Sequence, residues 1–346
     1  MAFFKKFFKN IVHDRDPKDD TVTVKDKPKP KYYGTVTPYP NFSASSDASV
    51  LQSAIDSKKV DEGVIVAILV KRSNEQRQMI KAVYESTTGK NLVKSLKSAL
   101  RSDLEDVALA LLMKPAYYDA HLLRKATKRL GTDEEVLVEV LATRSNNEIE
   151  EIKKVFKEEY AVELEQVIKD ETSGDFTKAL LALLSAKKKE STEVDSELAK
   201  NDAKVLFESG ESASKVNVST FIDILTTRSG PQLCKTFQVY ATMSDKTLPK
   251  ALQMELKGDI EDCLIGIVKC AWNTPAFFAE KLHHAMKGVG TQDKKLIRVL
   301  VSRSEVDLKK VVDEYKAMFG RSLQEDIVAD TKGQYQKVLL GLCGPQ

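Results

Sequence analysis

Four segments of the chain repeat one pattern: ILVKRSNEQRQMIKAVYE (68–85), VLATRSNNEIEEIKKVFKE (140–158), ILTTRSGPQLCKTFQVYA (224–241) and VLVSRSEVDLKKVVDEYK (299–316). Each segment carries an Arg-Ser pair, and successive arginines are separated by 72, 84 and 75 residues. An aromatic residue stands twelve positions after each arginine: Tyr84, Phe156, Tyr240 and Tyr315. A match of this length without a gap indicates four copies of one structural unit.

Apolar residues recur at i, i+3, i+4 and i+7 within each unit, which is the spacing of an amphipathic helix. Strand patterns are absent, and glycines divide each unit into short segments. We therefore expect an all-α protein of four repeats with about five helices each. Thr132 and Thr291, each before an acidic turn, are the expected N-caps of the helices that follow them.

The expected organisation is an amino-terminal helix and linker arm at 1–46, followed by repeats at 48–114, 115–187, 188–271 and 272–343. The third repeat opens with the polar stretch SAKKKESTEVDSELAKND, which is typical of a long connector. Residues 14–46 are rich in Pro, Lys, Asp and Thr, so this arm is expected to be an extended linker.

Composition excludes several classes of protein. The chain has 54 Lys and Arg residues against 51 Asp and Glu, so the net charge is only +3. A charge this small does not indicate a polyanionic partner, and we expect no binding to nucleic acid. The apolar runs fall short of the roughly 20 residues of a spanning helix, and no secretory signal opens the chain. The four histidines match no catalytic or metal arrangement, and no nucleotide-binding loop or nucleophile motif occurs, so we expect no enzyme.

A glycine loop and a carboxylate recur at a fixed separation. The loop reads MKGVGTQD at 286–293 and TKRLGTDE at 127–134. An acidic residue follows each anchor arginine by 27 positions, except in the first repeat, where the residue is alanine: Ala99, Glu171, Glu255 and Asp330.

Calcium chemistry explains why these residue types belong together. Ca²⁺ takes 6 to 8 oxygen ligands at about 2.3 to 2.6 Å, and main-chain carbonyls serve as well as carboxylates. Glycine lets alternate carbonyls turn inward. Carbonyls of Met286, Gly288 and Gly290 are therefore expected to hold calcium with the Asp330 carboxylate, leaving positions open for water or lipid phosphate. Alternatively, such a loop is only a helix connection with Thr as N-cap and Gly as C-cap.

With these residues in place, the sequence resembles the annexins across all four repeats, about 85% of its length. The resemblance is also carried by ETSGDFTKALLAL (171–183), PAFFAEKLHHAMKGVGT (275–291) and VLLGLCGPQ (338–346). It implies a slightly curved disc of four five-helix repeats. It further implies several calcium ions on the convex face, which bind membranes rich in phosphatidylserine.

The resemblance implies further calcium ligands. In the second repeat they are Thr127, Arg129, Gly131 and Glu171, with an accessory site at Thr132 and Glu134. Arg129 stands where glycine is usual, but the ligand there is a carbonyl. In the third repeat they are Gly210, Ala213, Lys215 and Glu255, although Ala213 and Lys215 replace small or glycine residues.

The first repeat departs furthest from this pattern. Lys59 and Ala99 occupy the glycine and acid positions, so its main site is expected to be lost. Weaker sites are implied at Lys59, Val60 and Glu62, and separately at Lys97, Leu100 and Glu105.

The amino-terminal residues 1–12 alternate phenylalanine and lysine. Phe3, Phe7 and Ile11 share one helical row, while the lysines lie on another face, so a basic amphipathic helix is expected. Such a helix inserts into an acidic bilayer or docks into an EF-hand groove. In related annexins this segment binds a small EF-hand dimer or tucks into the third repeat.

The expected function is calcium-dependent binding to acidic phospholipid membranes, in membrane organisation, aggregation or vesicle trafficking. The resemblance also implies phospholipase inhibition and anti-inflammatory regulation. It implies a cytoplasmic protein peripheral at membranes, with the nucleus and the extracellular surface also open. One alternative is a helical-repeat scaffold for protein partners with vestigial calcium loops. Another is calcium-independent membrane binding by residues 1–12.

Overall fold

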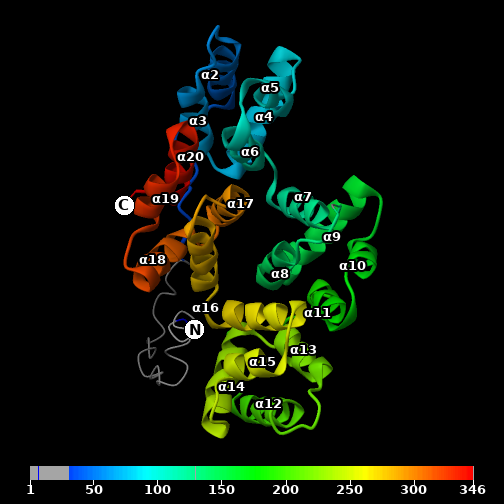
Figure 1. Ribbon diagram of the computed structural model, residues 1–346. Helices are drawn as coiled ribbons and strands as arrows, with labels where there is room; N and C mark the ends of the chain where they lie inside the picture. Colours follow the sequence, from blue (N-terminus) through cyan, green and yellow to red (C-terminus); the bar gives the residue numbers. More distant parts are fainter. Residues whose placement is uncertain (1–6, 8–30, 129, 346) are drawn as a thin grey trace, which may run out of the picture. The chain divides into compact units, whose positions relative to one another are not determined.

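The computed structural model describes residue 7 and residues 31–128 and 130–345. These residues form nineteen α-helices, α2 to α20, and no strand (Figure 1), which confirms the all-α prediction. The chain divides into two compact units. We call them unit 1/4, with the described parts of Lys25–Tyr118 and Phe278–Gln346, and unit 2/3, with Asp119–Phe277 and Phe7.

Unit 1/4 contains the first and fourth repeats. The first repeat folds into α2 (Ala44–Asp56), α3 (Glu62–Val70), α4 (Asn74–Thr88), α5 (Leu92–Ala99) and α6 (Ser102–Leu111). The fourth uses the second part of α16 (Asp259–Met286), then α17 (Asp293–Arg303), α18 (Leu308–Phe319), α19 (Leu323–Asp330) and α20 (Gly333–Cys343). Since α20 packs against α3 and α6, and α17 against α6, the two repeats share one core.

Unit 2/3 contains the second and third repeats. The second folds into α7 (Pro115–Lys128), α8 (Glu134–Thr143), α9 (Asn146–Tyr160), α10 (Leu164–Glu171) and α11 (Gly174–Leu184). The third folds into α12 (Ser196–Ser209), α13 (Val218–Thr227), α14 (Gly230–Met243), α15 (Leu248–Glu255) and the first part of α16. Asn273 (φ −161, ψ 93) breaks α16 before Pro275, so each of the four repeats has five helices, as predicted.

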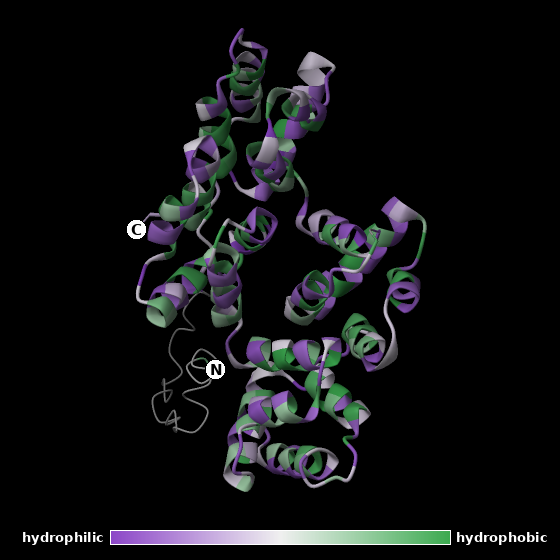
Figure 2. Cartoon of the chain, in the orientation of Figure 1, coloured by the Kyte–Doolittle hydropathy of each residue, from purple (hydrophilic) through white to green (hydrophobic). Residues whose placement is uncertain are grey.

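The repeated aromatic residues lie at the centre of each repeat. Tyr84, Phe156, Tyr240 and Tyr315 are each 0% exposed. The helices around them carry both hydrophobic and hydrophilic stretches, green and purple in Figure 2. Burying an aromatic side chain of this size is worth roughly 1.5 to 3 kcal/mol, which explains the repetition of the residue type.

The anchor arginines of the first three repeats form buried ion pairs with the first helix of their own repeat. Arg72 Nε lies 2.6 Å from Asp47 Oδ2, Arg144 Nη2 lies 2.8 Å from Asp119 Oδ1, and Arg228 Nε lies 2.8 Å from Asp202 Oδ2. Burial by itself lowers the pKa of Arg144, but the charge of Asp119 and its hydrogen bond raise that pKa above its ordinary value. Each pair therefore ties the first helix to the corner between the second and third helices.

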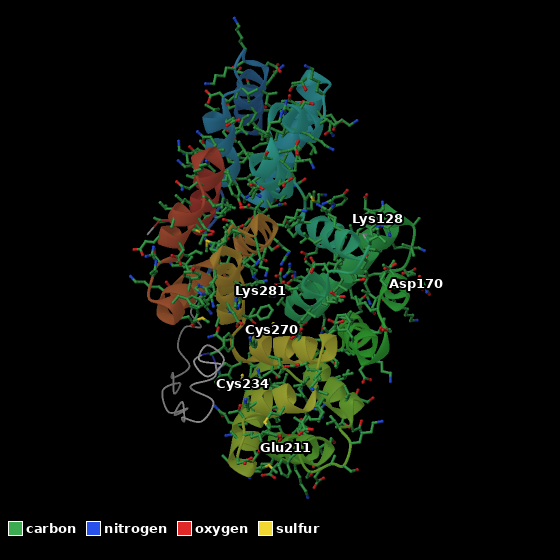
Figure 3. All side chains as sticks on the ribbon, viewed as in Figure 1. Lys128, Asp170, Glu211, Cys234, Cys270 and Lys281 are labelled. Atoms are coloured by element: carbon green, nitrogen blue, oxygen red, sulfur yellow. The ribbon has the colours of Figure 1, made fainter. Side chains whose placement is uncertain are left out.

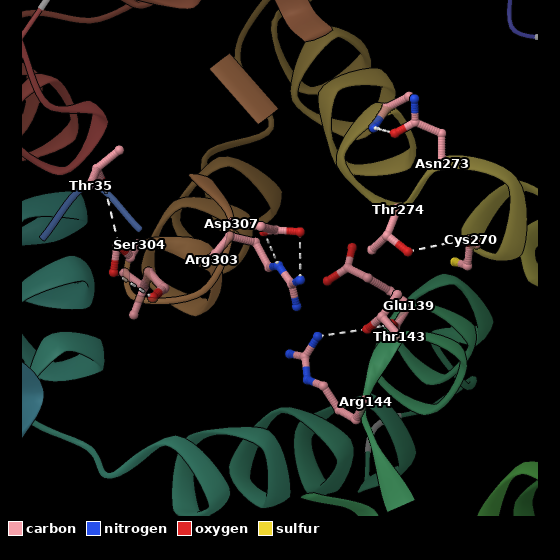
Figure 4. Close-up of polar contacts among 12 residues, drawn as sticks. Thr35, Glu139, Thr143, Arg144, Cys270, Asn273, Thr274, Arg303, Ser304 and Asp307 are labelled. Atoms are coloured by element: carbon pink, nitrogen blue, oxygen red, sulfur yellow. Dashed lines mark hydrogen bonds and ion pairs between the residues drawn. The ribbon is translucent and has the colours of Figure 1, made fainter. Parts of the chain in front are cut away.

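The fourth repeat neutralises its anchor arginine with a carboxylate from a different position. Phe278 stands where the other repeats have aspartate, 25 residues before Arg303. Arg303 Nε pairs instead with Asp307 Oδ1 at 2.8 Å (Figure 4), and its guanidinium carbon lies 4.3 Å from the centre of the Phe278 ring. The anchor arginine thus keeps a carboxylate partner in all four repeats, and it is buried in all but the third, where the Arg228 side chain is 31% exposed.

The serine after each arginine caps the third helix, except in the fourth repeat. Ser73, Ser145 and Ser229 are the N-caps of α4, α9 and α14. Ser304 instead ends α17, and its carbonyl accepts hydrogen bonds from the amides of Thr35 (2.8 Å) and Val36 (3.1 Å).

The described part of the arm is extended, as predicted, but it is bound to the repeats of unit 1/4. Figure 4 draws Thr35 against Ser304, and Lys309 N donates to Tyr33 O at 2.9 Å. Further along, Gln76 bonds both the amide and the carbonyl of Tyr39 (2.8 and 3.1 Å). The segment from residue 33 to residue 39 is therefore part of the folded unit and not a free linker.

Two other sequence-based expectations need correction or fall outside the described residues. The connector ends early, because Asp195 caps α12 and the stretch SELAKND forms its first turns, with Ala199 and Asp202 buried. The predicted helix at 1–12 lies outside the described residues except for Phe7, whose ring lies 5.5 Å from Lys269 Nζ. Over the described ranges, no helix is both long and apolar enough to cross a membrane.

The two ways of pairing a buried arginine predict a rescue experiment. Asp119→Phe should lower the free energy of unfolding by about 3 to 5 kcal/mol, because it leaves the Arg144 charge buried without its partner. Adding Glu148→Asp copies the Phe278 and Asp307 arrangement of the fourth repeat and should recover a large part of that loss. Urea unfolding of both variants measures the difference, with Glu148→Asp alone as the control. Equal stability of Asp119→Phe and the unsubstituted protein would contradict the assigned role.

Candidate calcium sites

The loop between the first two helices closes in the same way in three repeats. A main-chain bond joins Asp61 N to Ala54 O (3.0 Å), Asp133 N to Ala126 O (2.9 Å) and Gln292 N to Ala285 O (2.8 Å). In the third repeat the bond joins Asn217 N to Ser209 O (2.8 Å) and encloses one more residue. The third repeat therefore carries one extra residue in this loop, before the gapless segment that follows each anchor arginine.

The fourth repeat brings its predicted ligands together. Met286 ends α16, and Gly288 and Gly290 follow with φ values of 100 and 81. Residues with a side chain rarely adopt such values. Thr291 Oγ1 donates to the carbonyl of Asp330, the last residue of α19, at 3.2 Å and to its Oδ2 at 2.7 Å. The loop and the carboxylate are thus joined by a side chain of the loop itself.

The second repeat has the same geometry. Gly131 has a φ of 89, and Thr132 Oγ1 donates to the carbonyl of Glu171, the last residue of α10, at 3.1 Å. Figure 3 labels Lys128 and Asp170, which lie at the ends of α7 and α10 that bear the loop and Glu171. The predicted ligand Thr127 lies in the last turn of α7, and Glu134 opens α8, while Arg129 lies outside the described residues.

The expected capping role of the two threonines is wrong. Asp133 caps α8, since its side chain accepts from Val136 N, and Gln292 occupies the N-cap position of α17. The hydroxyls of Thr132 and Thr291 point instead to the carboxylate-bearing helix end. The sequence pattern could not distinguish the two roles, because both place a threonine before an acidic turn.

The third repeat presents a different loop. The carbonyl of Gly210, a predicted ligand, accepts a hydrogen bond from Ala213 N at 3.0 Å. Neither Ala213 nor Lys215 has a positive φ. The acidic residue Glu255 is retained at the end of α15. The carbonyls are therefore not arranged as in the second and fourth repeats.

A carboxylate that the sequence analysis missed holds this third loop. Glu211, labelled in Figure 3, accepts hydrogen bonds from Tyr240, from Ser244 Oγ at 2.6 Å and from Lys246 Nζ at 3.1 Å. Burial by itself raises the pKa of Glu211, but the hydrogen bonds lower that pKa by a larger amount. The pKa of Glu211 therefore lies below its ordinary value. An internal ammonium group therefore neutralises the loop. No repeated position signals this arrangement, because it belongs to the third repeat alone.

The first repeat lacks the glycine conformation and the carboxylate of the main calcium site. Lys59 lacks the positive φ of Gly131 and Gly290, and Ala99 ends α5 without a carboxylate. The carbonyl of Leu100, a predicted ligand, accepts a hydrogen bond from Arg101 Nη1 at 2.9 Å.

The other residues predicted for the weak sites of the first repeat lie on separate elements. Val60 is in the loop, Glu62 opens α3, Lys97 lies in the last turn of α5, and Glu105 lies in the first turn of α6. Among the described residues, no hydrogen bond or ion pair links these side chains to one another as Thr291 links its loop to Asp330.

Two further features mark the second and fourth loops. Leu130 and Val289, which stand directly before Gly131 and Gly290, are fully exposed, with a relative exposure of 110% each. In the part of the chain that the structure describes, no three His, Cys, Asp or Glu side chains are grouped to hold a metal. A cation in these loops would therefore depend largely on main-chain carbonyls.

Comparison with known proteins gives a consistent result. A family model described as Annexin matches residues 46–111, 118–183, 201–267 and 277–342. Annexin A1 of Cavia cutleri is 49% identical over 346 residues, 100% of both chains. The solved structure of annexin III superposes with a TM-score of 0.89 at 43% identity, over 91% of this chain and 98% of that one. A calcium-bound annexin (Sm)1 gives a TM-score of 0.81 at 32% identity, over 91% and 93%.

The positive φ of Gly290 predicts a separable effect on calcium binding. Gly290→Ala should lower the free energy of unfolding by about 1 to 2 kcal/mol and weaken calcium binding, because alanine draws this loop out of the left-handed region. Gly320→Ala is the matched control, since Gly320 has a φ of 74 at the C-cap of α18. Urea unfolding should show similar losses for both variants, whereas calorimetric titration with calcium should change for Gly290→Ala alone. Unchanged calcium binding in Gly290→Ala would rule out this loop as a site.

Proposed function

Because the chain belongs to the annexin family, whose members bind phospholipid in a calcium-dependent manner, we propose that it docks on acidic membranes through its second and fourth repeats. The observation that carries this proposal is that, in both repeats, a threonine ties a positive-φ glycine loop to the helix end that bears the acid, through the carbonyl of Glu171 in the second and through the carbonyl and carboxylate of Asp330 in the fourth. The proposed ligand on the membrane side is the phosphate of an acidic headgroup such as phosphatidylserine.

The proposed donors of the fourth repeat are the carbonyls of Met286, Gly288 and Gly290 with the carboxylate of Asp330. Those of the second are the carbonyls of Thr127, Arg129 and Gly131 with the carboxylate of Glu171, beside an accessory site at Thr132 and Glu134. Calcium, when bound, supplies positive charge that protein and lipid oxygens share, since it accepts 6 to 8 oxygens. Four donors from the chain leave room for water and for lipid phosphate.

The chain's own contribution is to hold the donors in place before the ion arrives. Thr291 fixes the Asp330 side chain, and the 2.8 Å bond from Gln292 N to Ala285 O closes the loop. A donor set that needs little rearrangement loses less conformational entropy on binding.

The exposed loop tips suit the same surface. Leu130 and Val289 gain nothing from the protein interior, because both are fully exposed. Transfer of such a side chain into an apolar environment is worth up to about 1.5 to 3 kcal/mol. We therefore propose that both tips enter the interfacial region of the bilayer once the loops have docked.

The first and third repeats contribute less calcium binding in this proposal. The third keeps Glu255, but its carbonyls at Gly210, Ala213 and Lys215 require a rearranged loop. The first lacks both the glycine and the carboxylate. Calcium is thus expected to act chiefly through two of the four repeats.

The remaining functional expectations follow from docking and need no catalysis. A protein that covers acidic lipid denies it to a lipase, so phospholipase inhibition and anti-inflammatory regulation are proposed as consequences of surface coverage. Membrane organisation, aggregation and vesicle trafficking are proposed for the same reason. Binding of an EF-hand dimer at residues 1–12 stays a prediction, as does the division among cytoplasm, nucleus and cell exterior.

Co-sedimentation with phosphatidylserine vesicles tests the proposal. The protein should pellet with calcium and be released by chelator. Asp330→Ala and Glu171→Ala should each raise the half-maximal calcium concentration by about tenfold or more, since loss of even an outer-shell partner commonly weakens metal sites by that factor. The controls Glu158→Ala and Glu197→Ala remove exposed carboxylates away from the loops.

Each outcome has a clear meaning. A shift in the loop variants but not in the controls supports calcium bridging. Binding that is indifferent to calcium contradicts it and assigns attachment to other cationic surfaces. Absence of binding in every condition favours the scaffold with vestigial loops.

A further inference from the structure

The first repeat keeps a main-chain frame, made of the loop closure and the corner after α5, that it shares with the second and fourth repeats, although Lys59 lacks the positive φ of their glycines. Its loop closes through Asp61 N and Ala54 O, as the second and fourth loops do. At the corner after α5, Ser102 has a φ of 54, although serine rarely adopts this conformation. The equivalent residues in the other repeats are glycines with φ values of 66, 78 and 67: Gly174, Gly258 and Gly333. The frame is therefore retained even where the residue type does not favour it.

Where the second and fourth repeats have residues that supply oxygen donors, the first repeat has a basic residue and an alanine. Lys59 stands at the position of Gly131 and Gly290, and Ala99 at that of Glu171 and Asp330. The tie between loop and helix end is lost as well, because Val60 replaces the threonine.

The guanidinium group of Arg101 donates hydrogen bonds to two carbonyls at the end of α5. Arg101 Nη1 donates to Ser98 O at 2.7 Å and to Leu100 O at 2.9 Å. The carboxyl end of a helix carries partial negative charge, so a cation is stable there. Arg101 is itself exposed, which leaves its other donors facing solvent.

These basic groups are available to a ligand. Lys58, Lys59, Lys97 and Arg101 are all exposed, and none of them forms an ion pair within the described parts of the chain. The nearest loop acid, Asp61, caps α3 by accepting from Val64 N at 3.2 Å.

The loop and the end of α5 belong to one surface of the repeat. Helices α2 and α5 are in contact. In the second and fourth repeats the equivalent loop touches the equivalent helix end, through Thr132 and Thr291. Because the first loop closes in the same way, it occupies the equivalent place in its repeat, beside the helix end that carries Arg101.

We propose that the first repeat binds anionic phospholipid headgroups directly through Lys58, Lys59, Lys97 and Arg101, without calcium. The proposal rests on the proposed function, because it is the shared frame with the membrane-docking loops that points this corner at lipid. An ammonium or guanidinium group attracts lipid phosphate as a bound calcium ion does, but it needs no carboxylate, which explains the loss of the acid at Ala99.

The proposed attachment has two properties that distinguish it from calcium bridging. It persists in chelator, and it weakens as salt rises, because exposed charges are screened over a Debye length of about 8 Å at physiological ionic strength. It would hold the protein weakly at an acidic surface before calcium strengthens the contact through the other repeats.

The test uses the full chain with substitutions Lys58→Gln, Lys59→Gln and Arg101→Gln combined. A matched control carries Lys187→Gln, Lys189→Gln and Lys200→Gln, three exposed cations of the connector before α12 and of α12 itself that give the same change in net charge; Lys200 pairs with Glu197 at the surface. Both are compared with the unsubstituted protein on phosphatidylserine vesicles and on neutral phosphatidylcholine vesicles. Each is measured in low-salt chelator and in saturating calcium.

We expect the first-repeat variant to lose about tenfold or more of its affinity for acidic vesicles in chelator, since each basic residue near such a surface contributes about fivefold. The control variant should lose clearly less, and the first-repeat variant should still bind in calcium, which also shows that it is folded. Equal losses in the two variants would overturn the inference and leave the proposed function intact. Failure of every protein to bind in calcium would defeat the proposed function itself. Chelator-resistant binding that inorganic phosphate abolishes at matched ionic strength would assign the cations to a soluble anion instead of a membrane.

Discussion

The arginine that opens each repeated Arg-Ser pair, buried in the first, second and fourth repeats and partly buried in the third, is the constraint on which the rest of the architecture depends. A guanidinium removed from water is costly unless a carboxylate neutralises it. Asp47, Asp119 and Asp202 do so from the first helix of their repeats, and the fourth repeat uses Asp307 from its own corner. In the first three repeats one pair therefore fixes where the first helix meets the second and third. The calcium loop, which follows the first helix directly, takes its position from that junction.

On this framework the loops differ in chemistry, and the third loop also differs in path, because it encloses one more residue. The second and fourth combine glycines of positive φ with a carboxylate, whereas the third neutralises its Glu211 with Lys246 and the first replaces the acid by Ala99. Main-chain closure is shared, so a single substitution changes what the corner binds without changing how the repeat folds. This separation explains why a calcium-binding array can carry cationic corners beside its metal sites.

The arm shows how a segment without a hydrophobic pattern becomes structured. Its described part carries Tyr32, Tyr33, Val36 and Tyr39, of which Val36 is buried, and its main chain is bonded to Ser304, Lys309 and Gln76. Ser304 and Lys309 belong to the fourth repeat and Gln76 to the first. These partners therefore lie more than 200 residues apart in the chain. Composition predicted an extended conformation correctly, but only the assembled unit supplies the hydrogen-bonding groups that fix it.

The sequence by itself determined the helical class, the five helices of each repeat and the recurrence of one aromatic position, because these are local, periodic patterns; the burial of that position came from the structure. It also identified the glycine loops and the acids Glu171 and Asp330 as belonging together, because their separation repeats. Only the tertiary structure decided the roles of Thr132 and Thr291 and the extra residue in the third loop. It also decided the hydrogen bonds that hold Glu211 and the bond from Arg101 to Leu100. Each of these depends on which groups meet across a loop and a helix end, and hydrogen-bond partners distant in sequence leave no periodic signal.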